Sequence, residues 1–315
     1  MNKIVVLDAD TVGDVSVFDS FKDFGQLTVY KTTHIQERIH HIADASIIIT
    51  NKVLIDAYVI DNCKQLQLVC LTATGMNNVD MEYAASKGIK VKNVAGYSTE
   101  SVAQHTFAML LSLLHNIGYY NSYVQSTVYS QQSLFTHIGP GYWQLQGKTW
   151  GIIGMGTIGK RVAEIAQVFG CSVVYYSTSG KNNTQPYTQK SLQELLQSSD
   201  IVSIHAPLND TTKGLIGLAE FKQMKKHAYI INVGRGGIIN ENDLAEALQK
   251  QYLAGACLDV MQQEPLDINS PLLQNNEISH KIIITPHVAW ISNEALATLM
   301  QKVYGNVKQF VEEGL

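Results

Sequence analysis

The chain of 315 residues has few of the features that mark special classes of protein. It contains only 6 prolines and 4 cysteines, 16% of its residues are charged, and no repeat or low-complexity tract is visible. Its densest apolar segment, 106–114, is interrupted by Ser112 and is far shorter than the roughly 18 residues that suggest a transmembrane helix. These deficits exclude disordered, collagen-like and repeat proteins and favour ordinary globular domains without a membrane partner.

The sequence also lacks an excess of basic residues. The 23 Lys and Arg residues face 27 Asp and Glu residues, which gives a formal net charge of −4. Proteins that bind nucleic acid usually carry a basic patch or stripe that neutralises phosphates. We therefore expect no nucleic-acid partner.

Metal-binding and disulfide patterns are missing as well. The cysteines are Cys63, Cys70, Cys171 and Cys257. They form no CxxC pair and show no zinc-ligand spacing, so they are expected to be buried, reduced thiols of a cytoplasmic protein. Residues 4–7 resemble a first strand more than the core of a signal peptide. The adjacent His40 and His41 would not face one ligand on a helix, so no metal site is expected.

Short apolar runs alternate with helical patterns along the whole chain. Strands are predicted at residues 4–7, 47–50, 68–71, 149–153, 172–176, 201–205, 229–233, 254–259 and 282–285. Helical periodicity lies between them, for example at 98–114, 158–169 and 241–251. Near-continuous apolar strands that alternate with helices are typical of parallel sheets covered on both faces. The pattern predicts an α/β fold in two series, one before residue 98 and one from residue 148.

A glycine-rich turn opens the second series. A strand leads into Gly154-Met-Gly156-Thr-Ile-Gly159, and a helix follows. Such a turn lets the backbone approach a pyrophosphate, and the helix N-terminus offers unpaired N–H groups. The context favours a dinucleotide; a different ligand such as S-adenosylmethionine, or a merely structural turn, stays open.

The acidic residue that usually holds the ribose of NAD is missing. It is expected at the end of the next strand, yet residues 165–193 contain no Asp or Glu. Ser177 follows that strand and Lys181 comes soon after. Hydroxyl groups can hold a bare ribose, whereas hydroxyl groups with a lysine could also accept a 2′-phosphate. These residues therefore permit NADP as well as NAD, and the sequence does not decide between the two cofactors.

Three later segments place polar residues after apolar strands. They carry Arg235 between glycines, Glu264 before a proline, and His287 after a proline. Ligands of α/β sheets bind at the carboxyl ends of strands. Arg235 suits bidentate capture of a carboxylate, and His287 with Glu264 suits acid–base chemistry. Taken singly, an arginine paired with a surface acid and a structural histidine remain the simpler interpretations.

Several motifs in the same order point to one family. They lie at residues 74–80 (TGMNNVD), 101–106 (SVAQHT), 154–159 (GMGTIG), 200–208 (DIVSIHAPL), 232–237 (NVGRGG), 258–265 (LDVMQQEP) and 285–290 (TPHVAW). Over nearly the whole chain the sequence resembles the D-2-hydroxyacid dehydrogenase family. Trp290 and the stretch 175–181 make it most like glycerate dehydrogenase and hydroxypyruvate reductase members. Ser177, where NAD-specific members have Asp, is a departure.

The resemblance implies a role for each matching position. Arg235, Glu264 and His287 would be catalytic, and substrate would also contact the backbone around Gly75 and Met76. Cofactor-binding residues would be Gly154, Gly156, Thr157, Ile158, Gly159, Ser177, Lys181, His205, Pro207, Val233, Asp259, Thr106 and Thr74. The reaction would transfer a hydride between a nicotinamide dinucleotide and a small 2-hydroxy or 2-keto acid.

The resemblance also implies an architecture. Residues 1–98 and 285–315 would form a discontinuous substrate domain, and 99–284 a dinucleotide-binding Rossmann domain, with the active site in a cleft between them. The resemblance also implies a homodimer, and the helix at 98–114 with the tyrosine-containing segment after it is the candidate for the contact. The alternative function is a corepressor-like protein that senses NAD(H) without catalysis; an enzyme acting on formate or phosphite fits the motifs less well.

Overall fold

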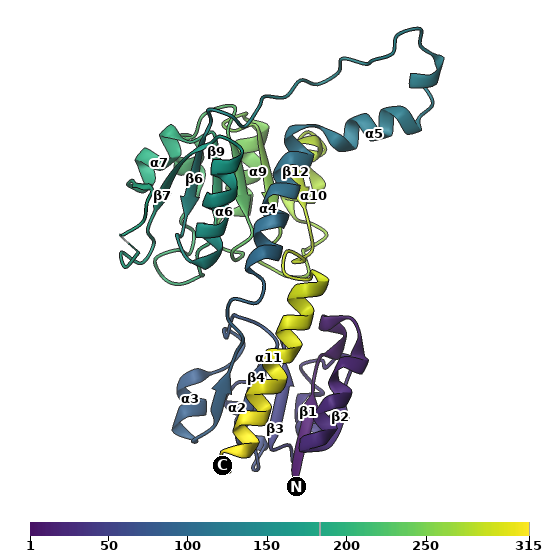
Figure 1. Cartoon of the computed structure of the whole chain (residues 1–315), viewed down its shortest axis with the longest axis vertical. Coiled ribbons are helices and arrows are strands. Elements are labelled where there is room, and N and C mark those ends of the chain that lie inside the picture. Colours follow the sequence, from purple (N-terminus) through teal and green to yellow (C-terminus); the bar gives the residue numbers. More distant parts are fainter. Residues whose placement is uncertain (183, 315) are drawn as a thin grey trace. The chain divides into compact units, whose positions relative to one another are not determined.

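The structure, a computed structural model, describes residues 1–182 and 184–314 and consists of two compact units (Figure 1). Unit 1 contains Met1–Ser98 and the residues from Ile291 onward, and unit 2 contains Thr99–Trp290. Each unit is built on a parallel sheet, which confirms the α/β class. The second boundary differs from the expected one. Residues 285–290 stay with unit 2, because the N–H groups of Val288 and Ala289 donate to Asp259 of that unit.

Unit 1 has a five-stranded parallel sheet in the order β2-β1-β3-β4-β5. Its strands are β1 (Asn2–Val6), β2 (Gly25–Val29), β3 (Ile47–Thr50), β4 (Leu68–Leu71) and β5 (Lys90–Lys92). Its helices are η1 (Ala9–Val12), η2 (Val15–Phe24), α1 (Arg38–Ile42), α2 (Ala57–Asn62), α3 (Met81–Ser86) and α11 (Asn293–Glu312). Every residue of β3 and β4 is buried, as their continuous apolar sequences predict.

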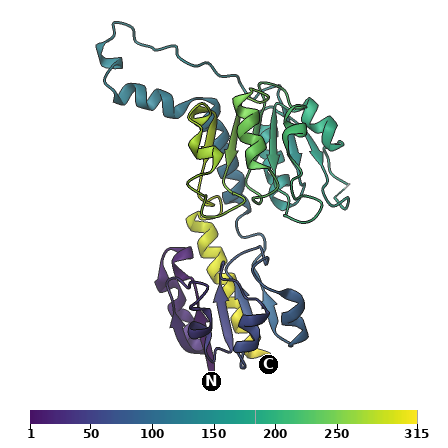
Figure 2. The same ribbon diagram turned by 180° about the vertical axis from the view of Figure 1, so that it is seen from behind.

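The C-terminal helix α11 completes unit 1. Ser292 caps it by accepting a hydrogen bond from the N–H of Ala295. Its buried side chains recur at helical spacing and include Leu299, Val303 and Val307. The helix packs against β4 and η2, and Figure 2 shows it from behind. The sequence pattern alone did not assign this helix to a sheet.

Unit 2 has a seven-stranded parallel sheet in the order β12-β11-β10-β9-β6-β7-β8. Its strands are β6 (Thr149–Ile153), β7 (Ser172–Tyr176), β8 (Thr188–Gln189), β9 (Ile201–Ile204), β10 (Tyr229–Asn232), β11 (Gly255–Leu258) and β12 (Ile282–Ile284). The chain runs outward from β6 to β7 and β8, then returns to place β9 on the other side of β6. Such a switch point is where α/β sheets bind ligands.

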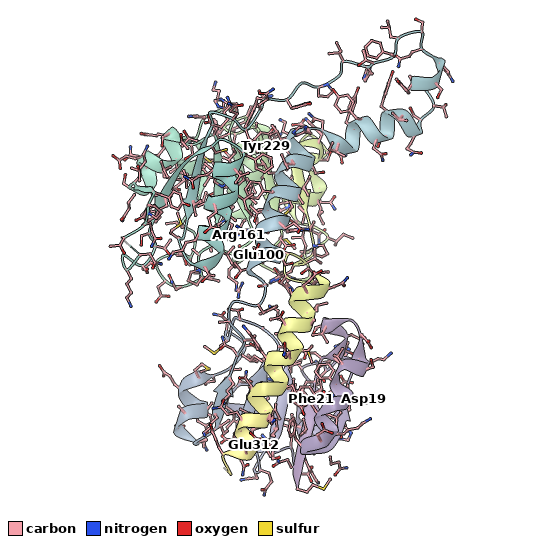
Figure 3. The ribbon with its side chains drawn as sticks, viewed as in Figure 1. Asp19, Phe21, Glu100, Arg161, Tyr229 and Glu312 are labelled. Carbon is pink, nitrogen blue, oxygen red and sulfur yellow. The ribbon has the colours of Figure 1, made fainter. Side chains whose placement is uncertain are left out.

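Helices cover both faces of this sheet. They are α4 (Thr99–Leu114), α6 (Thr157–Val168), α7 (Leu192–Ser198), α8 (Leu218–Phe221), α9 (Glu241–Gln249), α10 (Pro271–Gln274) and η4 (Ser279–Lys281). Two apolar clusters fill the interfaces, one against α7 and α9 and the other against α4 and α6. Glu100 of α4 accepts from Arg161 of α6 over 2.9 Å and links these helices at the surface (Figure 3).

The segment 117–142, which we name the arm, projects from the rest of unit 2 in both views (Figures 1 and 2). It contains α5 (Ile117–Gln125), η3 (Tyr129–Gln131) and the chain that returns toward β6. The returning chain is fastened to α5: Tyr119 Oη lies 2.8 Å from His137 Nε2, and the hydroxyl of Tyr120 donates to the carbonyl of Pro140. The arm is thus an ordered element, although α5 buries none of its residues.

Three strands lie outside the sequence prediction: β2, β5 and β8. All of them are at sheet edges, and none has a fully buried residue. An edge strand is covered on fewer sides, so it needs no continuous apolar run. Among the described residues, no helix is long and apolar enough to cross a membrane.

The buried carboxylate of Asp200 ties three segments together at the amino ends of the strands. It accepts hydrogen bonds from the Thr149 N–H, the Lys225 ammonium and His227 Nε2, each over 2.8 Å. Burial alone would raise the pKa of Asp200. The bonds from Lys225, Thr149 and His227 outweigh burial and lower this pKa to about 2.

We predict that Asp200→Asn lowers the free energy of unfolding by about 1–3 kcal/mol at pH 7, because it removes charge-assisted hydrogen bonds. The folded-state pKa lies below the ordinary 3.8, so this stabilisation is present above about pH 4 and is lost as the pH falls toward 2. Denaturant titrations at pH 7 and pH 2.5 check this. Asp210→Asn, at an exposed position, is the control, and an equal Asp200→Asn deficit at both pH values would contradict it.

Candidate active site

Six neighbouring strands of unit 2 end in register, so that their last residues pair with one another in a single row across the sheet. The paired residues of this row are Tyr176, Ile153, Ile204, Asn232, Leu258 and Ile284, taken from β7 to β12. Because the strands are parallel and in register, the residue after each of them emerges at the same edge. Those following residues are Ser177, Gly154, His205, Val233, Asp259 and Thr285. All but Thr285 are sequence-predicted site residues.

The glycine turn begins at the centre of this row. Gly154 has φ +94°, and an added Cβ would lie 2.9 Å from the Ala206 amide nitrogen, so only glycine suits this position. Gly156 precedes α6 and has open space where a side chain would stand. Thr157, Ile158 and Gly159 form the first turn of α6, whose N–H groups face no earlier helical turn.

A pocket of about 240 Å³ lies beside this turn. Its lining residues are Gly154, Met155, Gly156, Ser177, Thr178, Ser179, Asn182, His205, Pro207 and Asn209. The structure thus brings five predicted cofactor residues to one pocket. Asn182 and Asn209 are lining residues that sequence reasoning missed. Both follow predicted strand ends by several residues, so only their positions in the loops could have drawn attention to them.

The pocket fits a nucleotide. Gly156 leaves room for a phosphate at a helix N-terminus. Ser177 Oγ and His205 Nδ1 are buried and have no hydrogen-bond partner among the described residues. Buried polar atoms are nearly always paired, so these two indicate a polar ligand. Lys181 is exposed and is not part of the lining.

Other predicted cofactor residues of unit 2 lie outside this lining. Thr106 is buried in α4, and its hydroxyl donates to the carbonyl of Val102. Val233 is buried in the apolar cluster that includes Ala289. In unit 1, Thr74, Gly75 and Met76 follow β4, and the hydroxyl of Thr74 donates to the Val94 carbonyl over 2.8 Å.

The Arg235 loop is packed against the loop that carries Glu264. An added Cβ at Gly236 would overlap the carbonyl oxygen of Met261, so only glycine permits this approach. Arg235 Nη1 donates to the Gly234 carbonyl over 2.8 Å. Among the described residues no acidic side chain forms an ion pair with Arg235. The arginine is therefore not the partner of a surface acid.

Glu264 and His287 are in direct contact. His287 Nδ1 lies 2.8 Å from Glu264 Oε2, and the other carboxylate oxygen accepts from the Met261 N–H over 3.0 Å. A carboxylate accepts only, so the bond holds the proton on Nδ1. The Nε2 atom has no hydrogen-bond partner among the described residues, so it is free to exchange a proton with a substrate. About a fifth of the His287 side chain is exposed.

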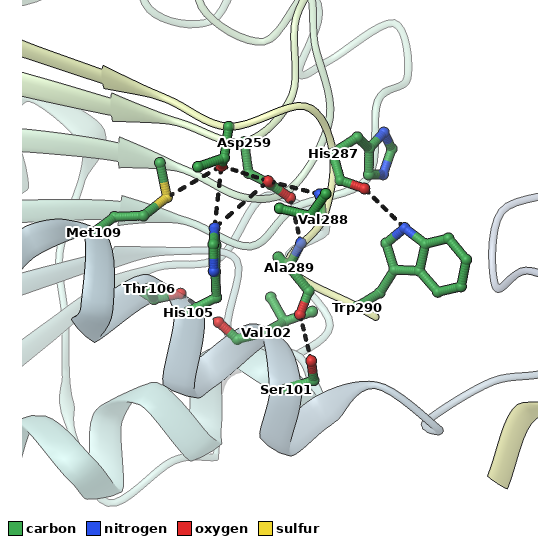
Figure 4. A network of polar contacts seen from close by, with 11 residues as sticks. Ser101, Val102, His105, Thr106, Met109, Asp259, His287, Val288, Ala289 and Trp290 are labelled. Atoms are coloured by element: carbon green, nitrogen blue, oxygen red, sulfur yellow. Dashed lines mark hydrogen bonds and ion pairs between the residues drawn. The ribbon is translucent and has the colours of Figure 1, made fainter. Parts of the chain in front are cut away.

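Asp259 holds the loop that presents His287 (Figure 4). It is 1% exposed, and its Oδ1 accepts from the Val288 N–H and the Thr285 hydroxyl, while Oδ2 accepts from the Ala289 N–H. His105 Nε2 lies 3.1 Å from Thr285 Oγ1. His287 itself has φ +56°, an uncommon backbone conformation for a residue other than glycine. This network therefore maintains a strained loop at the row of strand ends.

The arrangement defines a class of protein. A nucleotide pocket, a histidine–carboxylate pair and an arginine with no acidic partner among the described residues lie at one edge of one parallel sheet. They suit dinucleotide-dependent oxidoreduction of an anionic substrate. Within the described residues, no group of three or more His, Cys, Asp or Glu side chains could hold a metal ion.

Comparison with known proteins identifies the family. A family model described as "D-isomer specific 2-hydroxyacid dehydrogenase, NAD binding domain" matches residues 107–289. The chain is 34% identical to a hydroxypyruvate reductase of Blautia hydrogenotrophica, over 98% of this chain and 97% of the relative. It is 31% identical to a glycerate dehydrogenase of Methylorubrum extorquens, over 98% and 96%. The protein belongs to the D-2-hydroxyacid dehydrogenase family and is an NAD(P)-dependent oxidoreductase.

A solved structure supports the same assignment. D-lactate dehydrogenase from Aquifex aeolicus, complexed with NAD and lactic acid, superposes with a TM-score of 0.83 at 27% identity. The match covers 99% of this chain and 96% of that one. The resemblance drawn from the sequence motifs is thereby confirmed, and with it the nicotinamide dinucleotide as cofactor.

We predict that Gly236→Ala separates the Arg235 loop from Met261. Overpacking of this kind should lower the free energy of unfolding by about 1–3 kcal/mol, and misplacement of the loop should lower kcat/KM by about 10- to 100-fold. Gly305→Ala in α11 is the control, because an added Cβ there has nothing within 4 Å. Chemical denaturation and steady-state kinetics measure both effects. Equal values for the two variants would contradict the packing argument.

Proposed function

We propose that the protein interconverts a small 2-keto acid and the corresponding D-2-hydroxy acid, with a hydroxylated substrate such as hydroxypyruvate or glycerate favoured. The observation that carries the proposal is the His287–Glu264 contact of 2.8 Å, beside a loop whose Arg235 has no acidic partner among the described residues. The names of the relatives support the substrate class. A corepressor-like sensor would need no such acid–base pair.

His287 is the general acid for reduction. Glu264 accepts the hydrogen bond from Nδ1 and keeps the ring oriented, so Nε2 can deliver a proton to the keto oxygen. A bound reduced dinucleotide would supply the hydride for the keto carbon, and the proton from His287 would complete the hydroxyl group. In the reverse direction the neutral ring takes the hydroxyl proton. Glu264 also accepts from the Met261 N–H, which fixes its position independently of His287.

Arg235 binds the substrate carboxylate. Its planar guanidinium can donate two parallel hydrogen bonds, and no acidic side chain of the described chain competes for them. The same positive charge polarises the adjacent keto group. Backbone groups of Gly75 and Met76 contribute to substrate binding, so unit 1 acts as the substrate domain and unit 2 as the cofactor domain.

The cofactor is held along the strand-end row. Gly154, Gly156, Thr157, Ile158 and Gly159 receive the pyrophosphate, and Ser177, His205 and Pro207 receive the adenosine half. Thr74, Thr106, Val233 and Asp259 would also contact the cofactor, and Lys181 would be available for a 2′-phosphate. NAD is the expected cofactor, and the absence of an acid from the pocket lining also permits NADP.

We further propose that the protein is a cytoplasmic homodimer. All four cysteines are free and buried, which suits a reducing compartment. The arm exposes eight large apolar side chains: Ile117, Tyr119, Val124, Val128, Leu134, Phe135, Ile138 and Tyr142. A patch of this density on an ordered projection suits burial against a second copy.

We expect purified protein to oxidise NADH or NADPH in the presence of 2-keto acids, followed by absorbance. Arg235→Ala should raise KM for the keto acid and lower kcat/KM by about 10- to 100-fold, because a charge-assisted pair is lost. Glu264→Gln should lower kcat by about 10- to 100-fold with a smaller change in KM, because the proton-transfer step is affected. Glu82→Gln, at an exposed site in α3, is the control. No oxidation by the parent protein with any 2-keto acid would overturn the proposal.

The dimer has its own test. Phe135 and Ile138 are 88% and 92% exposed, so Phe135→Asp with Ile138→Asp should leave the folded monomer intact while placing charges in an apolar interface. Sedimentation velocity should then show a dimer for the parent and a monomer for the double variant. Ile268→Asp, at another exposed position (75%), should remain dimeric. A monomeric parent at 10 µM, or a dimeric double variant, would reject the arm as the interface.

A further inference from the structure

Two side chains of the nucleotide pocket have unused hydrogen-bonding atoms. Ser177 Oγ and His205 Nδ1 are buried without a partner among the described residues, and both residues line the pocket. Ser177 follows β7, the strand after the glycine turn, which is the position that holds the adenosine ribose in dinucleotide-binding units. We therefore expect these two atoms to form hydrogen bonds with polar groups of the ribose.

A short chain of buried hydrogen bonds determines which proton His205 carries. Trp150 Nε1 lies 2.8 Å from Ser203 Oγ, and Ser203 Oγ lies 2.9 Å from His205 Nε2. The indole nitrogen can only donate, so Ser203 accepts there. Its single hydroxyl hydrogen is then free to donate to His205 Nε2, which must accept. The ring proton is thereby placed on Nδ1.

The opposite tautomer leaves a buried group unpaired. If Nε2 carried the proton, Ser203 would accept from both sides, and its own hydrogen would have no acceptor. Ser203 and Trp150 are both fully buried, so no solvent could replace that bond. A charged ring is excluded too, because burial lowers the pKa of His205 to about 3. His205 is a neutral donor at its Nδ1 atom.

We propose that His205 contacts the cofactor as a neutral donor, through its Nδ1–H, to the oxygen at the 2′ position of the adenosine ribose. Trp150 and Ser203 are positioning residues that determine this tautomer. The inference rests on the proposed cofactor site. That oxygen is a hydroxyl in NADH and a phosphate oxygen in NADPH, and either accepts a hydrogen bond. The pocket lining carries no Asp, Glu, Lys or Arg. A neutral donor can therefore bind the 2′ oxygen of either cofactor without discriminating between NADH and NADPH by charge.

The tautomer is tested in the free, full-length protein. Nitrogen-15 spectra of the histidine rings should show the His205 ring protonated at Nδ1 and unchanged from pH 5 to pH 8. In Ser203→Ala the proton should move to Nε2, because the hydroxyl donor is gone. If the His205 ring of the parent protein is protonated at Nε2, or titrates between pH 5 and pH 8, the proposed Nδ1–H tautomer is wrong. This measurement needs no cofactor and no activity.

Cofactor binding is measured by calorimetric titration of the same proteins with NADH, NADPH and 2′-deoxy-NADH, the analogue of NADH that lacks the 2′ hydroxyl of the adenosine ribose. Ser203→Ala should weaken NADH and NADPH binding by about 3- to 10-fold each, the loss of one neutral hydrogen bond. Removing the 2′ oxygen should weaken binding to the parent by a similar factor and have no further effect in Ser203→Ala. Ser199→Ala is the control for the loss of a buried serine hydroxyl in unit 2, because Ser199 Oγ, unlike Ser203 Oγ, has no hydrogen-bond partner among the described residues and does not contact His205.

The outcomes separate this inference from the proposed function. Equal NADH affinity of the parent and Ser203→Ala, or equal affinity of the parent for NADH and 2′-deoxy-NADH, overturns the role of His205 while the cofactor site stands. Absence of binding of both NADH and NADPH to the parent overturns the cofactor site and this inference together. If Ser203→Ala does not fold, the ring spectra and the 2′-deoxy comparison on the parent still decide.

Discussion

The in-register ending of six parallel strands is the constraint on which the rest of unit 2 depends. Paired residues from Tyr176 to Ile284 form one row. Every segment that follows a strand must therefore leave the sheet at the same edge. The backbone hydrogen bonds of the sheet thereby bring residues more than 100 positions apart in the chain, such as Ser177 and His287, to the same edge. Chemistry is built there from short loops on a rigid support.

The loops at this edge are held by hydrogen bonds from buried polar groups. Asp259 uses both carboxylate oxygens to hold the backbone at Val288 and Ala289, which keeps His287 in a left-handed conformation. Met261 contacts Gly236 on one side and donates to Glu264 on the other. Strain and close approach are tolerated at these positions because the surrounding bonds over-determine them.

Much of this arrangement could be predicted, but unevenly. Buried strands such as β3 and β9 were predictable, because strands covered on both faces have continuous apolar sequences. The edge strands β2, β5 and β8 were not, because partial exposure removes that signal. The boundary expected at residue 285 lies at 291, since the segment after β12 is bound to Asp259 through contacts that no local pattern encodes.

The sequence by itself determined the α/β class, the glycine turn and the identity of the polar residues after each strand, because these depend on local periodicity and on residue type. Only the tertiary structure decided which of those residues meet. It pairs His287 with Glu264, gives Arg235 no acidic partner within residues 1–182 and 184–314, and links Trp150 through Ser203 to His205. Such contacts join distant segments, and their geometry follows from strand order and register. Neither the order of the strands nor their register can be read from the sequence alone.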